Sequence, residues 1–464
     1  MKTLREIRQI NNAVQFVTDK MNFSSVFGRK TMLDQKFMTK KEAILLELNK
    51  LNAILEILKK EESISNIAKF EAKLHQINDI KNTINRLSKA QTLDDVELFE
   101  IKKFALICIE LNEVIDTFNL DFVKWNDLTA VADILDPEKK RIPHFYIYSD
   151  YDDDLFKIRD EIDKSDDETV RENLLLKSEK IEQEVRQMLS SKLADYHLFI
   201  SQNISTISEL DFIFAKAKLA IELDFSEPQY SNETIEYIEI FHPMVKEALQ
   251  SEGRDFQNLS LELYTAPCLV TGVNMGGKSV MLKTIVLIQY LFQFGFYVPA
   301  QKAKLRIFKE IYFNSGDTQS DVGGLSSFAS EMLIVNDIIS AAKRGRRIMV
   351  VLDELARTTN PDEGGAILSA VLEILDNYNV VSVITTHYGQ IKWDGHRLRV
   401  KGLRKPAENE EINVKNIGNF MDYSLVPEDK SHSYMQALDI AKVLGVDGEL
   451  LSKANKYLNN PNTD

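Results

Sequence analysis

A glycine-rich turn followed by Lys278 and Ser279 has the clearest chemistry in this chain. The run TGVNMGGKS, residues 271–279, fits the phosphate-binding spacing G-x-x-x-x-G-K-[ST]. Its glycines let backbone N–H groups face phosphate oxygens, Lys278 supplies positive charge, and the Ser279 hydroxyl binds Mg²⁺. The alternative is a chance glycine-rich turn, which the Lys-Ser register and the apolar flanks disfavour. The expected nucleotide-binding residues are Gly272, Asn274, Met275, Gly276, Gly277, Lys278, Ser279 and Val280.

Two carboxylates end an apolar run, RIMVVLDE, at residues 347–354. A continuous β-branched run of this kind predicts a buried parallel strand. At its carboxyl end Asp353 would support Mg²⁺, and Glu354 would act as the general base or orient the attacking water. The alternative is a core strand with a solvated acidic end. The phosphate-binding run upstream favours the catalytic interpretation.

A third apolar run, 380–385, leads into Thr386 and His387. A histidine at the end of such a strand could sense the γ-phosphate or the lytic water. A lone histidine is more often structural, so the assignment of His387 depends on the other two motifs.

The elements that must position these residues form the back of the chain. From about residue 228 to 460 the pattern is strand, loop, helix, which predicts a mostly parallel sheet with helices on both faces. Phosphate loops of this fold lie at the carboxyl ends of the strands. The front, residues 1–135, has helical periodicity, and charged helices are expected at about 151–164 and 168–203, joined by a tight turn at 165–167. The tail, 433–458, predicts two short helices.

Bulk properties describe a globular chain of 464 residues with a net charge of −14. Such a chain binds nucleic acid poorly unless it has a local basic surface. Residues 1–60 carry 12 Lys/Arg against 6 Asp/Glu, so this basic N-terminal segment could meet an acidic partner or could simply be a solvated helix surface. Cys108 and Cys268 are expected to be reduced core residues. No secretory pattern or membrane span is expected, and we predict a cytoplasmic protein.

With these motifs assembled, the chain resembles the MutS family of ATPases. The Asn274-Met275-Gly276-Gly277 filling of the loop is more specific than the general pattern. Phe241-His242-Pro243 resembles the family's His-Pro element upstream of the ATPase, and the run 209–217 resembles the end of its lever helix. The runs 353–355, 360–364 and 385–388 are nearer to the second bacterial MutS branch than to the mismatch-repair branch. The run 316–328 resembles the loop that reaches across a dimer, in which Ser326, or second Ser327, would contact the γ-phosphate held by the neighbouring subunit. The resemblance is strong over roughly 200–450.

The resemblance implies ATP and Mg²⁺ as ligands and a homodimer whose ATP-driven closure moves the lever helices. It also has departures. There is no room for the mismatch-recognition domain, residues 165–167 leave no space for the DNA clamp, no nuclease domain is expected after Asp464, and the Gly-containing segment before the last helices is replaced by 428–432.

These features favour two functions. The family default is a DNA-acting ATPase, related to mismatch repair or recombination proteins but without mismatch specificity. The alternative is a remodelling ATPase, because the runs 421–425 and 437–441 resemble the reactivase subunit proposed for a cobalamin-dependent lysine 5,6-aminomutase. A nucleotide-binding scaffold without turnover is disfavoured by the intact motif residues.

The expected fold is an α/β P-loop NTPase domain, with a mostly parallel sheet similar to those of ABC and MutS proteins, preceded by an all-α core and lever. The expected parts are a helical core at 1–135, a linker and lever hairpin at 136–225, a MutS-type P-loop ATPase domain at 226–430 and a helical dimerisation segment at 431–464. The expected catalytic residues are Glu354, His387 and, in trans, Ser326; the expected Mg²⁺ residues are Ser279 and Asp353.

Overall fold

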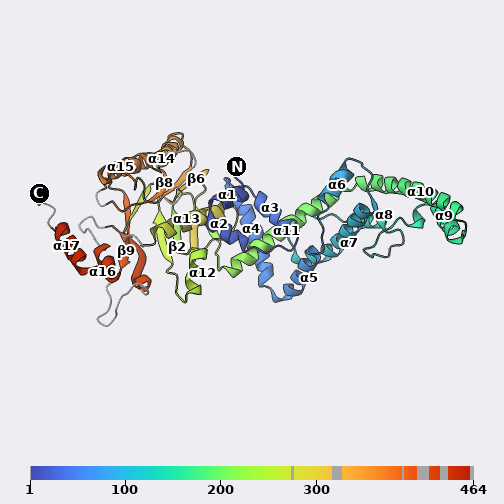
Figure 1. The fold of residues 1–464 in the computed structure, drawn as a ribbon, viewed down its shortest axis with the longest axis horizontal. Helices are drawn as coiled ribbons and strands as arrows, with labels where there is room; N and C mark the ends of the chain where they lie inside the picture. The colour runs from blue at the N-terminus through green and yellow to red at the C-terminus, as the bar shows by residue number, and fades with distance from the viewer. Residues whose placement is uncertain are drawn as a thin grey trace.

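The molecule is elongated, with two sheets near one end and a helical arm at the other (Figure 1). The computed structural model describes residues 2–272, 276–315, 327–388, 391–404, 417–428 and 437–459. The N-terminus lies beside the sheets, whereas the C-terminal helices lie beyond them, at the end opposite the arm (Figure 1).

The described elements from Leu4 to Glu222 are helices. Several begin at a side-chain cap: Thr3 with Glu6 and Asp94 with Glu97 form capping boxes. The helices are α1 (Leu4–Ile10), α2 (Asn12–Asp19), α3 (Gly28–Asp34), α4 (Lys41–Lys59), α5 (Ile64–Leu74), α6 (Lys81–Ser88), α7 (Asp95–Phe118), α8 (Thr129–Leu135), α9 (Asp153–Lys164), α10 (Glu168–Ala194) and α11 (His197–Glu222), with short 3₁₀ turns at Glu61–Ser63 and Ser149–Tyr151.

The arm is the hairpin of α9 and α10, and the predicted tight turn at 165–167 joins them. Asp167 caps α10 by accepting from the N–H groups of Thr169 and Val170. The predicted single helix over 168–203 is wrong, because α10 ends at Ala194. The Tyr196 N–H turns back to the Leu193 carbonyl at 2.9 Å, and His197 Nδ1 lies 2.7 Å from the Ala194 carbonyl oxygen, so the helix is closed there and α11 starts anew.

Two sheets follow the helices. The larger has six strands in the order β10-β9-β4-β8-β7-β6, parallel except for the β9/β10 pair, and therefore confirms the mostly parallel sheet. The smaller has the order β1-β5-β2-β3. The strands are β1 (Pro228–Tyr230), β2 (Ile235–Ile240), β3 (Leu259–Leu263), β4 (Pro267–Thr271), β5 (Lys302–Leu305), β6 (Glu310–Asn314), β7 (Ile348–Leu352), β8 (Val381–Thr385), β9 (His396–Leu403) and β10 (Met421–Pro427).

Helices cover both faces of the six-stranded sheet. Successive side chains of a strand point to opposite faces, so alternate residues of one strand belong to different cores. On β4, Cys268 and Val270 share a core with α13, whereas Leu269 shares another with α14 and α15. Figure 1 shows α14 and α15 as a layer on one side of the sheet. The remaining helices are α12 (Pro243–Ser251), α13 (Lys278–Gln293), α14 (Ser327–Lys343), α15 (Pro361–Asn377), α16 (Ala437–Val443) and α17 (Gly448–Asn459), with a 3₁₀ turn at Ile417–Phe420.

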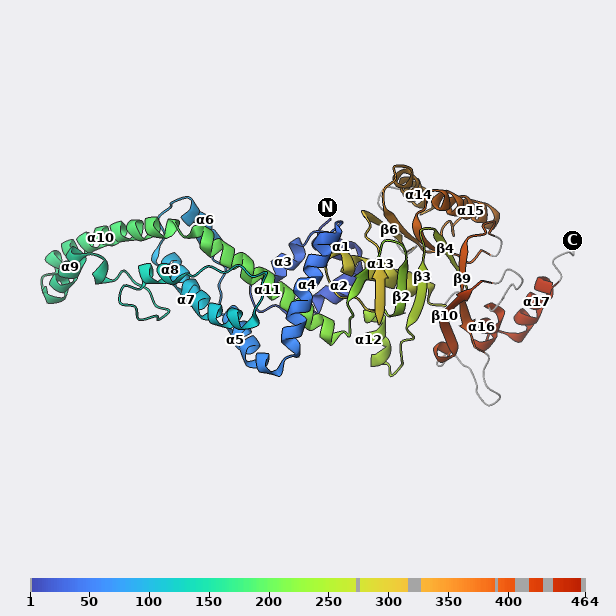
Figure 2. The ribbon, with the colours of Figure 1, turned by 180° about the vertical axis from the view of Figure 1, so that it is seen from behind.

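The core around α13 also takes in the N-terminal helices. Leu4, Val14, Ile44 and Leu48 pack with α13 and the small sheet, whereas a separate core joins residues from α4 to α8 with the arm and α11. Figure 2 shows α11 running from the arm toward the sheets, alongside α4. Packing alone does not assign domains, so the four predicted parts and the three boundaries between them stay predictions.

Two further expectations can be compared with the structure. Cys108 and Cys268 are free and buried, as predicted. Within the described ranges no helix is both long and apolar enough to cross a membrane.

Candidate nucleotide-binding site

The phosphate-binding run starts at the end of the central strand β4. Gly272 has φ +137°, a region that favours glycine, and a Cβ added there would lie 3.1 Å from Val400 Cβ on the neighbouring strand β9. Both the backbone angle and the crowding by β9 therefore require glycine as the chain leaves the sheet.

Gly277 closes the loop at the start of α13. It is the N-cap with φ +73°, and a Cβ there would lie 2.9 Å from Cδ1 of Tyr423. The ring of Tyr423, on β10, thus packs directly on the loop backbone. Gly276 is buried, whereas Asn274 and Met275 lie outside the described residues.

Lys278 reaches back across the loop. Its ammonium group is buried and donates a hydrogen bond to the Gly272 carbonyl at 2.5 Å. Burial lowers the pKa of Lys278, and the carboxylates of Glu354 and Asp353 oppose that shift. Because β4 and β7 both run parallel to β8, Lys278 and the two acidic residues lie at the same edge of the sheet. Ser279 is exposed and Val280 half-buried in the first turn of α13, where a helix N-terminus favours anions.

Asp353 and Glu354 follow β7, as the sequence predicts, and a threonine of the next strand holds both. The Thr385 hydroxyl donates to Asp353 Oδ1 at 2.5 Å and accepts from the Glu354 N–H at 3.0 Å. The Asp353 N–H donates to the Asn314 carbonyl at 2.9 Å, which extends the β6–β7 pairing. Since β7 and β8 are parallel neighbours, their carboxyl ends bring these groups together.

Glu354 is held in an uncommon backbone conformation. Its φ is +51°, in the left-handed region, and such strain persists only where the surroundings impose it. The Thr385 hydroxyl holds its N–H, and Arg357 Nη1 donates to its Oε2 at 3.2 Å. These bonds hold the turn that carries Glu354 at the end of β7, where its side chain is 18% exposed.

The same turn is fixed from two more elements through Ala356, whose φ is +61°. Its N–H donates to Glu331 Oε2 of α14 at 3.1 Å, and its carbonyl accepts from the Tyr388 hydroxyl at 2.6 Å. Burial raises the pKa of Glu331. Gly364 leaves room for Tyr388, because a Cβ there would lie 2.3 Å from the Tyr388 oxygen.

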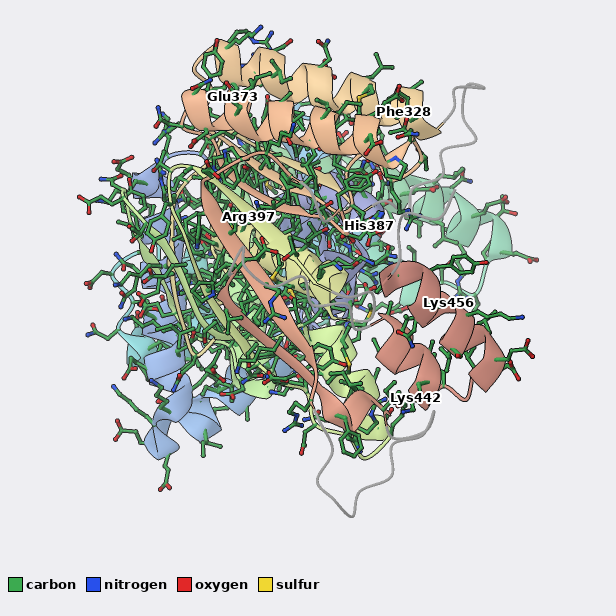
Figure 3. The ribbon with its side chains drawn as sticks, turned by 90° about the vertical axis from the view of Figure 1, so that its left-hand side faces the viewer. Phe328, Glu373, His387, Arg397, Lys442 and Lys456 are labelled. Atoms are coloured by element: carbon green, nitrogen blue, oxygen red, sulfur yellow. The ribbon has the colours of Figure 1, made fainter. Side chains whose placement is uncertain are left out.

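His387 is exposed, at the same edge of the sheet. The preceding Thr386 donates its N–H to the Val270 carbonyl at 3.1 Å, so this segment passes beside the end of β4. The His387 ring lies 4.7 Å from that of Tyr388. Figure 3, a view onto the sheet end, places His387 between the α14/α15 layer and the C-terminal helices. The structure brings His387 to the edge where the loop lies, and its role stays a prediction.

A largely buried ion pair contacts the residue that precedes the loop. Glu428 accepts from the Thr271 hydroxyl through one oxygen and from Arg397 Nε, at 2.7 Å, through the other. Arg397 and Glu428 side chains are 10% and 16% exposed, so the pair is largely shielded from water. Glu428 opens the segment that departs from the family pattern, and here it fixes the residue just before Gly272.

The described part of the site contains most of the expected residues and some that sequence reasoning missed. Ser326 lies outside the described residues, as does the side chain of Ser327. Thr385, Tyr423, Glu331 and Glu428 were not expected, because only strand pairing shows which distant side chains meet the motif residues.

The acidic and hydroxyl groups suit Mg²⁺ with a nucleotide. Among the described residues no three His, Cys, Asp or Glu side chains form a metal cluster of their own. Mg²⁺ commonly uses one or two carboxylates together with water and substrate phosphates, so Asp353 and Ser279 are a sufficient protein contribution.

Comparisons with known proteins show which family this part of the chain is similar to. Residues 268–461 match the family described as MutS domain V. The chain is 31% identical over 290 residues to Endonuclease MutS2 of Pediococcus pentosaceus and 32% identical over 290 residues to that of Carboxydothermus hydrogenoformans, covering 61% and 60% of this chain and 34% of each relative. Endonuclease MutS2 of Ligilactobacillus salivarius is 34% identical over 215 residues, or 45% of this chain and 26% of the relative. The matched part thus spans about a third or less of these relatives.

Proposed function

Because residues 268–461 are a MutS domain V, related to the second branch of the MutS family, we propose that this protein is a MutS-type ATPase that uses ATP and Mg²⁺. The observation that carries the proposal is the position of Lys278, Asp353 and Glu354 at one edge of the sheet, after the carboxyl ends of the parallel strands β4 and β7. A phosphate-binding lysine, a metal-supporting carboxylate and a water-activating carboxylate are the parts that phosphoryl transfer to water requires.

The residues divide the work. The loop glycines and Lys278 bind the phosphates, and Ser279 and Asp353 hold Mg²⁺, which when bound neutralises developing charge on the phosphate oxygens. Glu354 takes the proton of the attacking water, and the Thr385 hydroxyl keeps the Glu354 backbone in place. His387 senses the γ-phosphate. Each of these roles is proposed.

We further propose a homodimer in which Ser326 acts on the nucleotide bound by the neighbouring subunit. The homodimer is supported by exposed apolar side chains on α17, where Leu450 is 59% and Tyr457 75% exposed. ATP binding closes the two subunits, and hydrolysis releases them. The resulting movement passes to α11, which we name the lever helix.

DNA is the first candidate partner, because the relatives are named endonucleases of the MutS2 type. The electrostatics give it little help. Five of the twelve cations of the basic N-terminal segment form ion pairs with carboxylates of the chain itself: Arg5, Arg8, Lys20, Lys50 and Lys59. Sequence-independent DNA binding depends mainly on cations available for phosphates.

A partner protein is the second candidate, and the arm favours it. The range 149–184, which includes α9 and the first half of α10, has 14 acidic and 6 basic residues. A net charge of this sign repels a phosphate backbone and attracts a basic protein surface. A cobalamin-dependent aminomutase, in need of remodelling to exchange its cofactor, is the client that the sequence resemblance suggests.

Steady-state ATP hydrolysis separates these proposals. The purified protein is assayed alone and with duplex, branched and single-stranded DNA, at low and near-physiological salt. Stimulation by DNA that falls with salt supports the DNA-acting ATPase. Basal hydrolysis without a DNA response supports the protein client. No hydrolysis under any of these conditions would contradict the proposed ATPase.

A further inference from the structure

A fully buried lysine joins the lever helix α11 to the far end of the phosphate-binding helix α13. Lys216 has a side chain only 1% exposed. Its ammonium group donates to the carbonyl oxygens of Phe294 and Gly295, at 3.1 and 3.3 Å, just beyond the last turn of α13. The carbonyl end of a helix carries partial negative charge, so a cation is favoured there.

The environment of Lys216 is built for a charge. Glu47 of α4 lies 3.4 Å from its nitrogen, and the rings of Phe212 and Phe296 lie 4.3 and 4.6 Å from it as cation–π partners. Burial of a lysine is costly unless such partners compensate. A leucine or methionine would fill this space more cheaply, so the charge calls for a reason beyond packing.

The backbone at Gly295, just after α13, also packs closely against α4. Gly295 has φ +69°, and a Cβ there would lie 2.6 Å from Glu47 Cβ and 3.2 Å from the methyl group of Met38. The helix end therefore approaches α4 as closely as glycine allows, and it cannot shift without moving its neighbours.

Gln293 fixes the same helix end to two further segments. Its buried amide donates to the carbonyl oxygens of Met38 and Phe308, at 2.7 and 2.8 Å, and accepts from the Phe308 N–H at 3.1 Å. The Met38 N–H in turn donates to the Gln293 carbonyl at 2.9 Å. These bonds fix the end of α13, and Lys216 adds a charged link to α11 beside the apolar contact of Phe212 with Phe296.

We propose that Lys216 is a positioning residue through which α13 sets the position of the lever helix α11 in response to nucleotide. The inference rests on the proposed ATPase function. One helix connects the two places: Lys278 is the first residue of α13, at the phosphate loop, and the 16 residues of α13 end two residues before Gly295. At about 1.5 Å per residue the helix is roughly 24 Å long, and a packed helix moves as a rigid body.

Lys50 provides a matched control. It lies in the same charge cluster, pairing with Glu47 at 3.2 Å and with Glu209 of α11. Among the contacts described for Lys50, the pair with Glu47 lies within α4, the pair with Glu209 connects α4 to α11, and none reaches α13. Lys50→Met thus removes a lysine from the cluster without cutting the link between α13 and α11.

The test is hydrogen–deuterium exchange of the full chain with and without Mg²⁺ and ATPγS, followed by mass spectrometry of peptides from α13 and α11. Binding is measured in parallel with a fluorescent ATP analogue. In the parent, nucleotide should slow exchange in both helices. In Lys216→Met the response of α13 should remain and the response of α11 should fall to less than half, whereas Lys50→Met should retain both.

The outcomes separate the two proposals. A parent chain that binds no nucleotide would overturn the proposed function and this inference with it. A parent that binds nucleotide and responds only in α13, or a Lys216→Met chain whose α11 responds as in the parent, would overturn the coupling role alone. Should Lys216→Met not fold, Lys216→Gln must show the same loss, and a normal α11 response in that variant would overturn the role.

Discussion

Thr385→Val removes one hydroxyl and with it the two hydrogen bonds that hold the catalytic turn. Thr385 is fully buried, donates to Asp353 Oδ1 at 2.5 Å and accepts from the Glu354 N–H at 3.0 Å. Valine has the same shape, so packing is preserved. The substitution leaves a buried carboxylate with one donor fewer and a backbone N–H without its acceptor.

The expected cost follows from those two bonds. A hydrogen bond to a charged group contributes about 1.5–3 kcal/mol, and an N–H left without a partner costs about 1–3 kcal/mol when buried. The Glu354 N–H is only partly buried and the two terms are not additive, so we expect a loss of about 2–4 kcal/mol in unfolding free energy. Freed from its clamp, Glu354 can also leave its left-handed conformation, and a loss of about 1.4–2.8 kcal/mol of transition-state stabilisation corresponds to a tenfold to hundredfold lower kcat.

Urea denaturation and steady-state phosphate release measure the two effects. Ser382→Ala is the control: Ser382 lies on the same strand, is equally buried, and its hydroxyl has no hydrogen-bond partner in the described part of the chain. This control should change kcat by less than about twofold. Nucleotide affinity should stay near that of the parent in both variants. A Thr385→Val protein with the parent kcat and the parent stability would refute the role assigned to this hydroxyl.

Three further predictions concern the glycine-rich loop, the buried Lys216 and the dimer. Gly277→Ala places a Cβ 2.9 Å from Tyr423 on a residue whose φ is +73°, so ATP affinity, measured by fluorescence titration, should fall by about tenfold or more. The double variant with Tyr423→Ala should regain part of the lost affinity, and an unchanged affinity in Gly277→Ala would contradict this packing. Burial lowers the pKa of Lys216 from 10.5 to about 8. The charge of Lys50 also lowers this pKa, whereas the carboxylates of Glu47 and Glu209 raise it. Between about pH 8 and pH 10.5 the unfolded chain therefore binds more protons than the folded chain, and the cost of burying the charge is fully present only below about pH 8. The unfolding free energy of the parent should rise relative to that of Lys216→Met toward pH 10.5, by up to roughly 3 kcal/mol. A difference between the two proteins that stays constant with pH in urea denaturation would exclude this. Ser326→Ala should lower turnover while leaving the nucleotide affinity of the monomer nearly unchanged, and a loss of affinity in the monomer would show that Ser326 is structural or acts in cis.

The fold behind the motifs was predictable because the signals are local. The apolar runs before Gly272 and Asp353 became β4 and β7, and the helix expected after the loop became α13. Continuous apolar runs in parallel strands and glycine-rich turns depend on neighbouring residues, so one sequence is enough to recognise them. The prediction that this helix continues to residue 203 was wrong. The helical pattern of apolar residues continues past Ala194, but the contact of His197 with the Ala194 carbonyl oxygen ends the helix there.

The supporting residues were not predictable because they depend on tertiary pairing. Thr385 lies 31 residues from Glu354 in the chain, and their hydrogen bond exists only because β7 and β8 are neighbours. Tyr423 lies even further from Gly277, and nothing in its local sequence marks it as a contact of the loop. Lys216 was visible in sequence only as part of a run of family resemblance, since burial of a lysine cannot be inferred from periodicity.

The measurement that tests the central claim most directly is ATP binding and multiple-turnover phosphate release by the parent and by Glu354→Gln. This substitution keeps the size of the side chain and removes the carboxylate that would take the proton from water. The parent should release phosphate continuously with Mg²⁺, and Glu354→Gln should bind ATP with similar affinity, release almost none and accumulate as an ATP-bound dimer. Hydrolysis by Glu354→Gln at the parent rate would contradict the assignment of Glu354 and the site built around it.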